Sequence, residues 1–260
     1  MKSLYLTFLI CFAFYFTNAQ CNGYTELCDK RFDEVCIVMT HNAYNAEDEG
    51  FVLGNQTYGL ERQLMDGVRG FMLDIYDDGT EIVVYHSVEI LGKRPLQDEL
   101  GFIKDFLDNN PTEILSIIFE TNVTSTQLEN ELMVAGLMSY LHEQTLGTSW
   151  PTLQEMIDDD KRLVIFSESD NGQATQPWYH YAWAHSFDTN YSYADPSEFN
   201  CDVNRGDVTN SLYLVNHWIT SGIGTGDINQ ATVVNANPLL IDRLQQCEME
   251  NNRFPNFIGV

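Results

Sequence analysis

Short β-type runs alternate with helix-type runs along most of this chain, and this alternation restricts its fold more than any other feature. Apolar, often β-branched runs predict strands at 36–40, 68–75, 82–86, 114–120, 162–167, 211–215 and 257–260. Apolar residues at helical spacing predict helices at 60–65, 96–107, 127–141 and 239–249. Strands that alternate with helices form parallel sheets, and this many repeats favour a closed or nearly closed α/β barrel over an open sheet. The segment 168–210 is rich in Asp, Asn, Ser, Tyr and Trp and is expected to form long loops.

The length of 260 residues and the hydrophobic content of 44% suffice for one large core, so a single domain is expected. Residues 1–19 are predicted to be a signal peptide, since Lys2 precedes an apolar run and Thr17-Asn18-Ala19 offers a cleavage site. The domain then comprises residues 20–260, and the protein is expected to be secreted and soluble. An uncleaved N-terminal anchor is the alternative. No later run is long enough to span a membrane.

Sequons and cysteines agree with an extracellular location. The three predicted glycosylation sites are Asn55, Asn122 and Asn190. Five cysteines remain after the signal peptide, so at least one thiol is unpaired within the chain. Cys36 falls in an apolar run and is expected to be buried as a small hydrophobic residue. The predicted disulfides therefore join Cys21 to Cys28 and Cys201 to Cys247.

The formal net charge of -25 excludes nucleic acid as a partner and repels anionic membrane surfaces. No glycine-rich nucleotide-binding motif follows a predicted strand, and no acidic run has the spacing of an EF-hand loop. The function is therefore sought in side chains at the strand ends.

Four ionisable residues occupy equivalent places in successive predicted strands. Residues two apart in a strand point to the same face. His41, Asp74, His86 and Glu120 are therefore each expected to share the inward face with the small or apolar residues two and four positions before them. Barrel enzymes carry their chemistry at this end of the strands. Two histidines aimed at one pocket suggest paired acid and base chemistry, with Asp74 as a third catalytic residue.

Three segments in order carry a resemblance to a known family: THNAY (40–44), GVRGFMLDIYDDGTEIVVYHS (67–87) and NPTEILSIIFE (110–120). Together they resemble the X-domain of phosphatidylinositol-specific phospholipases C, and most of all the secreted PLC-like phosphodiesterases of plants and fungi. The resemblance implies a distorted TIM-type (β/α) barrel. It also implies phosphoryl transfer in which His41 is the general base and His86 protonates the leaving oxygen.

The chain departs from both phosphate-stabilising patterns of that family. Bacterial members use an arginine two residues beyond the aspartate, where this chain has Tyr76. Calcium-dependent members use four oxygen ligands, of which Asn42, Asp74 and Glu120 match three and Met72 stands at the fourth. The resemblance therefore implies either a three-residue Ca²⁺ site that is weaker than a four-ligand one, or a site that uses no cofactor.

In relatives, the run that resembles NFIGV (256–260) is followed by an aspartate. If this aspartate orients the general base in those proteins, His41 requires another hydrogen-bond partner in this chain. Because the last predicted strand is short, the barrel is expected to close imperfectly. Glu168, Trp183 and Tyr191 are candidate substrate-binding residues in the loop-rich half.

The expected substrate is a phospholipid or a soluble phosphodiester, with transient contact to a membrane surface. Two other functions remain open. One is a catalytically degenerate barrel that binds a lipid head group, glycan or protein. The other is a phospholipase D-like phosphodiesterase.

Overall fold

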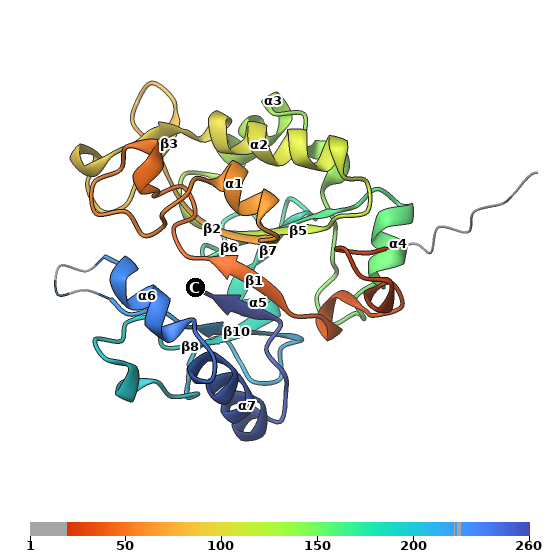
Figure 1. Cartoon of the computed structure of the whole chain (residues 1–260). Helices are drawn as coiled ribbons and strands as arrows, with labels where there is room; N and C mark the ends of the chain where they lie inside the picture. The colour runs from red at the N-terminus through yellow and green to blue at the C-terminus, as the bar shows by residue number, and fades with distance from the viewer. Residues whose placement is uncertain (1–19, 221, 223–224) are drawn as a thin grey trace, which may run out of the picture.

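In a computed structural model of the chain, residues 20–220, 222 and 225–260 are described, so the predicted signal peptide lies outside the described residues. The centre of the molecule is one curved sheet with the strand order β7-β6-β5-β2-β1-β11-β10-β8-β9 (Figure 1). Its strands are β1 (Ile37–Thr40), β2 (Gly70–Asp77), β5 (Leu115–Asn122), β6 (Leu163–Ser167), β7 (Tyr179–Tyr181), β8 (Ser186–Thr189), β9 (Val203–Arg205), β10 (Leu212–Asn216) and β11 (Phe257–Gly259). All neighbours from β7 to β8 are parallel, and β9 is antiparallel to β8. The α/β barrel predicted from the alternating pattern is confirmed.

The helices lie mainly outside this sheet, with α2 and α3 over one side and α7 over the opposite side (Figure 1). The α-helices are α1 (Leu60–Met65), α2 (Leu96–Asn109), α3 (Ser125–Val134), α4 (Leu153–Asp158), α5 (Ala182–His185), α6 (Ile228–Val234) and α7 (Leu239–Asn251). Short 3-10 helices are η1 (Thr25–Leu27), η2 (Phe32–Glu34), η3 (Glu47–Glu49), η4 (Glu89–Leu91), η5 (Met138–Tyr140) and η6 (Pro196–Glu198). Helix α3 ends earlier than predicted because Gly136, with φ +72°, takes the left-handed conformation that stops helices.

Strand alternation divides the core into two layers. Met39, Ile118 and Leu214 point into the barrel, and Leu73, Ile117 and the predicted stripe of α2 form the outer layer. The inward parity predicted for β1, β2 and β5 is therefore correct.

The barrel is open, as predicted, but the opening is not at the last strand. Strand β11 pairs with both β1 and β10, although it is short. The sheet instead ends at β7 on one side and at β9 on the other. Imperfect closure thus arises within the segment 168–210, far from the C-terminal strand.

Two sequence predictions differ in detail from the structure. The segment 168–210 is mostly loop, as predicted, but it also contributes the short elements β7, α5, β8 and β9, which the sequence pattern did not predict. Strand β3 (Ile82–Val84) is not a barrel strand: it runs antiparallel to β2 and pairs with β4 (Arg94–Pro95). Ile82 and Val84 accordingly face the outer core, contrary to the predicted parity. The β2–β3 hairpin still contributes to the site, because the chain that leaves β3 places His86 beside Asp74.

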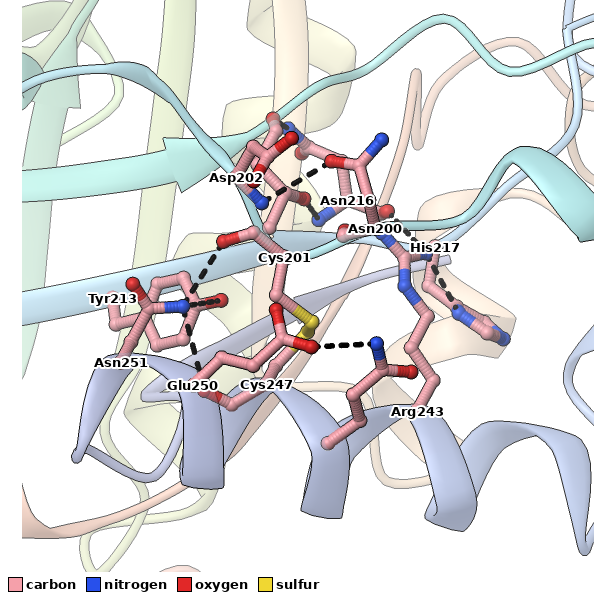
Figure 2. The surroundings of a disulfide bond; sticks show 12 residues. Asn200, Cys201, Asp202, Tyr213, Asn216, His217, Arg243, Cys247, Glu250 and Asn251 are labelled. Carbon is pink, nitrogen blue, oxygen red and sulfur yellow. Dashed lines mark hydrogen bonds between the residues drawn. A yellow bond between two sulfur atoms is a disulfide. The ribbon is translucent and has the colours of Figure 1, made fainter.

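The two predicted disulfides are present in the described structure, at Cys21–Cys28 and Cys201–Cys247. The second ties α7 to the segment before β9, and Figure 2 shows Arg243 of the same helix reaching towards the end of β10. Cys36 is unpaired as predicted but exposed, because its side chain faces away from the buried Ile37. Among the described residues, no helix has both the length and the apolar character needed to cross a bilayer.

Candidate active site

The two predicted histidines face each other at the carboxyl end of the barrel. His41 directly follows β1, and the hairpin of β2 and β3 delivers His86. Their ring centroids are 6.5 Å apart with an interplanar angle of 74°. The two imidazoles are therefore near neighbours, with their rings edge to face.

His86 is held by a carboxylate and an amide. Its Nδ1 lies 3.1 Å from Asp74 Oδ2 and 3.2 Å from the side-chain amide of Asn42. With the Asn42 amide turned over, its nitrogen donates to both oxygens of Asp74, and its oxygen accepts from His86 Nδ1. Asn42, at φ +48°, thus bridges the aspartate and the histidine, and its amide is already engaged there.

His41 is enclosed by a ring and an amide. Trp218 stacks on its imidazole at 4.0 Å with an interplanar angle of 6°. The amide nitrogen of Asn55 lies 3.2 Å from Nδ1. Burial, together with the neighbouring His86, lowers the pKa of His41 to about 3, so the ring is neutral at neutral pH.

Asn55 was predicted to carry a glycan, and the structure contradicts this. Its side chain is buried, with 8% exposure, and its amide nitrogen, to which a glycan would be attached, contacts His41. A glycan there would displace the loop from the site. The other two predicted sites differ in this respect, because Asn122 is exposed and Asn190 is partly exposed.

Two carboxylates stand side by side on the wall of the site. Asp74 and Glu120 are direct partners in the pairing of β2 with β5, and both line the cavity. Burial and the charge of Asp74 raise the pKa of Glu120. Oxygen donors whose negative charges repel each other suit a hard divalent cation, so Asp74 and Glu120 fit Ca²⁺. Asn42 would have to release His86 or Asp74 to join them.

A positively charged side chain, which the sequence motifs did not reveal, is supplied by Arg205 at the end of the antiparallel strand β9. Its guanidinium forms ion pairs with Glu168 at 3.0 Å and with the fully buried Asp188 at 2.6 Å. Trp183 and Tyr191 lie against it, 3.9 and 4.6 Å from its guanidinium carbon to the ring centroids. The three predicted substrate-binding residues, Glu168, Trp183 and Tyr191, therefore converge on one arginine that sequence reasoning missed.

One signal in the sequence pointed to Arg205. It is one of only three Lys or Arg residues after position 162, the others being Arg243 and Arg253, in a strongly acidic stretch. An arginine in a stretch with few basic and many acidic residues is more informative than an arginine among mixed charges. The following Gly206, at φ +78°, packs against the backbone of Ser186 and fixes the turn.

These groups surround a cavity of about 140 Å³. It is lined by His41, Met72, Asp74, Ile118, Glu120, Glu168, Tyr191, Arg205, Leu214, Asn216 and Trp218. Trp183 does not line it but supports Arg205 from behind. The Oδ1 atom of Asn216 is buried in this wall and has no hydrogen-bond partner within the described structure. The cavity thus offers a ligand an acceptor, a cation and an aromatic ring.

The remaining histidines lie elsewhere. His142, His180 and His185 pack around Trp150, which belongs to the inner core layer. His217 donates from Nε2 to Val234 O and accepts from Arg243, which settles its role as structural. Figure 2 places Arg243 on α7 with His217 and Asn216 above it.

Comparison with known proteins decides the family. The PI-PLC X 1 family profile matches residues 27–260, nearly the whole described chain. The chain belongs to the PI-PLC X family. It is 28% identical over 264 residues to a PI-PLC X domain-containing protein of Arabidopsis thaliana, covering 88% of this chain and 58% of that protein. It is 25% identical over 272 residues to an uncharacterized secreted protein of Arthroderma benhamiae, covering 94% and 60%. The chain thus spans about three fifths of the length of these two relatives.

Solved structures show the same fold. The phosphatidylinositol-specific phospholipase C of Listeria monocytogenes matches with a TM-score of 0.56 at 16% identity, covering 89% of both chains. That of Staphylococcus aureus matches with a TM-score of 0.57 at 15% identity, covering 91% of this chain and 89% of that one. These likenesses support a PI-PLC-type TIM barrel.

Proposed function

We propose that this member of the PI-PLC X family is a phosphoric diester hydrolase that cleaves phosphatidylinositol-like glycerophospholipids. The observation that carries the proposal is the pair His41 and His86, whose ring centroids lie 6.5 Å apart. His41 lines the cavity, and so does Asp74, which contacts His86 Nδ1. A single histidine would serve many structural roles. Two opposed imidazoles, each held through Nδ1, suit proton transfer on both sides of a phosphorus atom.

In the proposed reaction, His41 Nε2 removes the proton from the inositol 2-hydroxyl. The resulting oxygen attacks phosphorus, the bond from phosphorus to the glycerol oxygen breaks, and His86 gives its proton to that oxygen. Diacylglycerol and a cyclic inositol phosphate are the products of this first step. Water then opens the cyclic phosphate, with His86 as the base and His41 as the acid, which completes the hydrolysis and returns both histidines to their starting states. His41 is neutral at the start, and the negative charge of a bound phosphodiester favours its protonated form. Asp74 stabilises the charged form of His86.

The charge of the cavity is the main difficulty for an anionic substrate. Three carboxylates line it, and Arg205 is paired with one of them and with Asp188. We therefore include Ca²⁺ at Asp74 and Glu120, with Asn42 as the third ligand expected from the family resemblance. When bound, the ion would supply the positive charge that a phosphoryl group requires. Activity should then be lost in EDTA and restored by Ca²⁺; a full rate in saturating EDTA contradicts the metal and leaves the histidine pair in place.

Arg205, Tyr191 and Asn216 are proposed to bind the polar head group. A guanidinium donates to hydroxyl and phosphate oxygens, and an aromatic ring packs against the face of a sugar-like ring. The unpartnered Oδ1 of Asn216 accepts a hydroxyl proton. Glu168 completes this wall, and burial raises its pKa to about 7 despite Arg205.

Exposed apolar side chains beside the mouth support a membrane-bound substrate. Val52 and Leu53 lie on one loop, and Val88 and Ile90 on the next, with exposed fractions from 48 to 90%. A backbone hydrogen bond from Val52 to Leu91 joins the two loops. Because the protein carries a formal charge of -25, we propose contact with a neutral rather than an anionic bilayer surface. A secreted protein, as one relative is described, meets such a surface outside the cell.

The deciding experiment is turnover of phosphatidylinositol in mixed vesicles, with product analysis. His41→Ala and His86→Ala should each reduce the rate by about 100-fold or more with the fold intact, because each removes a proton carrier. Phosphatidic acid as the product would instead indicate phospholipase D-like chemistry. No turnover by the native chain across phosphodiesters, with and without Ca²⁺, would favour a degenerate barrel that only binds its ligand.

A further inference from the structure

A loop that follows β1 is fastened to the backbone of His41. The backbone nitrogens of Asn55 and Gln56 both donate to Asn45 O, at 2.9 and 3.1 Å. The side chain of Gln56 donates to His41 O at 2.9 Å. The loop therefore holds a fixed position relative to the imidazole.

Two buried asparagine side chains on this loop form a chain of amides that ends at the ring. Asn45 Nδ2 donates to Asn55 Oδ1 at 2.7 Å, and the Asn55 amide meets His41 Nδ1 at 3.2 Å. Asn45 is 3% exposed and Asn55 is 8% exposed. Gly226 closes the other side, since a Cβ at this position would stand 2.4 Å from Asn55 Nδ2. The Asn55 amide is therefore held beside His41 Nδ1, because Asn45 binds its oxygen and Gly226 lies against its nitrogen.

The orientation of these amides decides which ring nitrogen of His41 carries the proton. If Asn55 Nδ2 donates to Nδ1, the neutral ring is protonated at Nε2, which then has no lone pair for a substrate proton. If both amides are turned over, His41 Nδ1 donates to Asn55 Oδ1, and Asn55 Nδ2 donates to Asn45 Oδ1. The hydrogen bond between the asparagines survives this exchange, because each amide offers both a donor and an acceptor. Only the second arrangement leaves Nε2 able to act as a base.

We propose that Asn55, supported by Asn45, is the positioning residue of His41 and selects the tautomer whose Nε2 lone pair is available to the cavity. A neutral amide pair performs the task that a carboxylate performs in catalytic triads. The consequence for catalysis rests on the proposed function, but the tautomer itself does not. The two are therefore tested separately.

The first test reads the tautomer directly from ¹⁵N chemical shifts of histidine-labelled protein at pH 7. All proteins carry Thr57→Ala, which removes the sequon and leaves Asn55 intact. The reference protein should show His41 protonated at Nδ1. Asn55→Asp should keep this form because a carboxylate only accepts, whereas Asn55→Leu should move the ring towards the Nε2-protonated form. Gly226→Ala, which displaces the amide and keeps Asn55, should resemble Asn55→Leu.

The second test is kinetic. Asn55→Leu should lower kcat about 10- to 100-fold with KM within about twofold, and Asn55→Asp should recover most of the rate. A thermal unfolding curve for each variant checks that the native fold is present. A reference protein protonated at Nε2, or a tautomer and kcat that do not respond to Asn55→Leu, overturns the inference. If the tautomer responds but the native chain turns over no phosphodiester, the inference holds and the proposed function fails.

Discussion

Acid should destabilise this protein through a histidine that lies outside the active site. His180 of β7 is 1% exposed and uses both ring nitrogens: Nδ1 donates to Ile165 O at 2.8 Å, and Nε2 accepts from Gln144 N at 3.0 Å. Burial, with the neighbouring His185 and His142, lowers its pKa from 6.5 to about 3. A proton added at Nε2 would also meet the Gln144 N–H group.

The direction and the size of this change in stability follow from the linkage between proton binding and folding. At pH 5 the unfolded chain binds a proton at this histidine and the folded chain does not, so stability is present above pH 6.5 and is lost as the pH falls towards 3. With these two pKa values, the free energy of unfolding should fall by about 2 kcal/mol between pH 7 and pH 5 from His180 alone.

Urea unfolding at the two pH values measures this, with His180→Gln as the test variant. The variant is expected to be less stable at both pH values, but its loss on acidification should be about 2 kcal/mol smaller than that of the native chain. Phe166→Leu is the matched control: Phe166 lies 5.6 Å from His180 between ring centroids, and its truncation removes packing without removing a titrating group. An equal loss on acidification in the native chain and in His180→Gln would refute the reasoning.

Two further outcomes are expected. Arg205→Met leaves the fully buried Asp188 without its ion pair and should cost about 3 kcal/mol or more in urea unfolding, and Asp188→Asn in the same chain should recover part of it; additive costs would contradict the pairing. Ile90→Asp, at a side chain that is 90% exposed, should weaken binding to phosphatidylcholine vesicles about tenfold in a sedimentation assay. Met249→Asp on α7, where the side chain is 76% exposed, is its control and should change nothing; equal effects of the two would exclude a specific contact face.

The local pattern of the sequence determined much of the fold. Period-two alternation in β1, β2 and β5 correctly placed Met39, Met72 and Ile118 inside the barrel, because strand parity is a local property. The apolar stripe of α2 and both disulfides were also predicted correctly from the sequence. The same reasoning failed for β3, since nothing within three residues distinguishes a parallel strand from the return arm of a hairpin.

The sequence by itself also determined the main chemical groups of the candidate site. His41 and Asp74 follow or end recognisable strand motifs, whereas His86 was found through the family resemblance of its segment, because the strand parity predicted there was wrong. Only the tertiary structure decided what surrounds them. Asn55 looked like a glycosylation site, and Arg205 had no motif, yet the first contacts His41 and the second lines the cavity. The physical reason is that a hydrogen bond or an ion pair between segments leaves no periodic trace in either segment. Such contacts exist only after the hydrophobic core has brought the loops together.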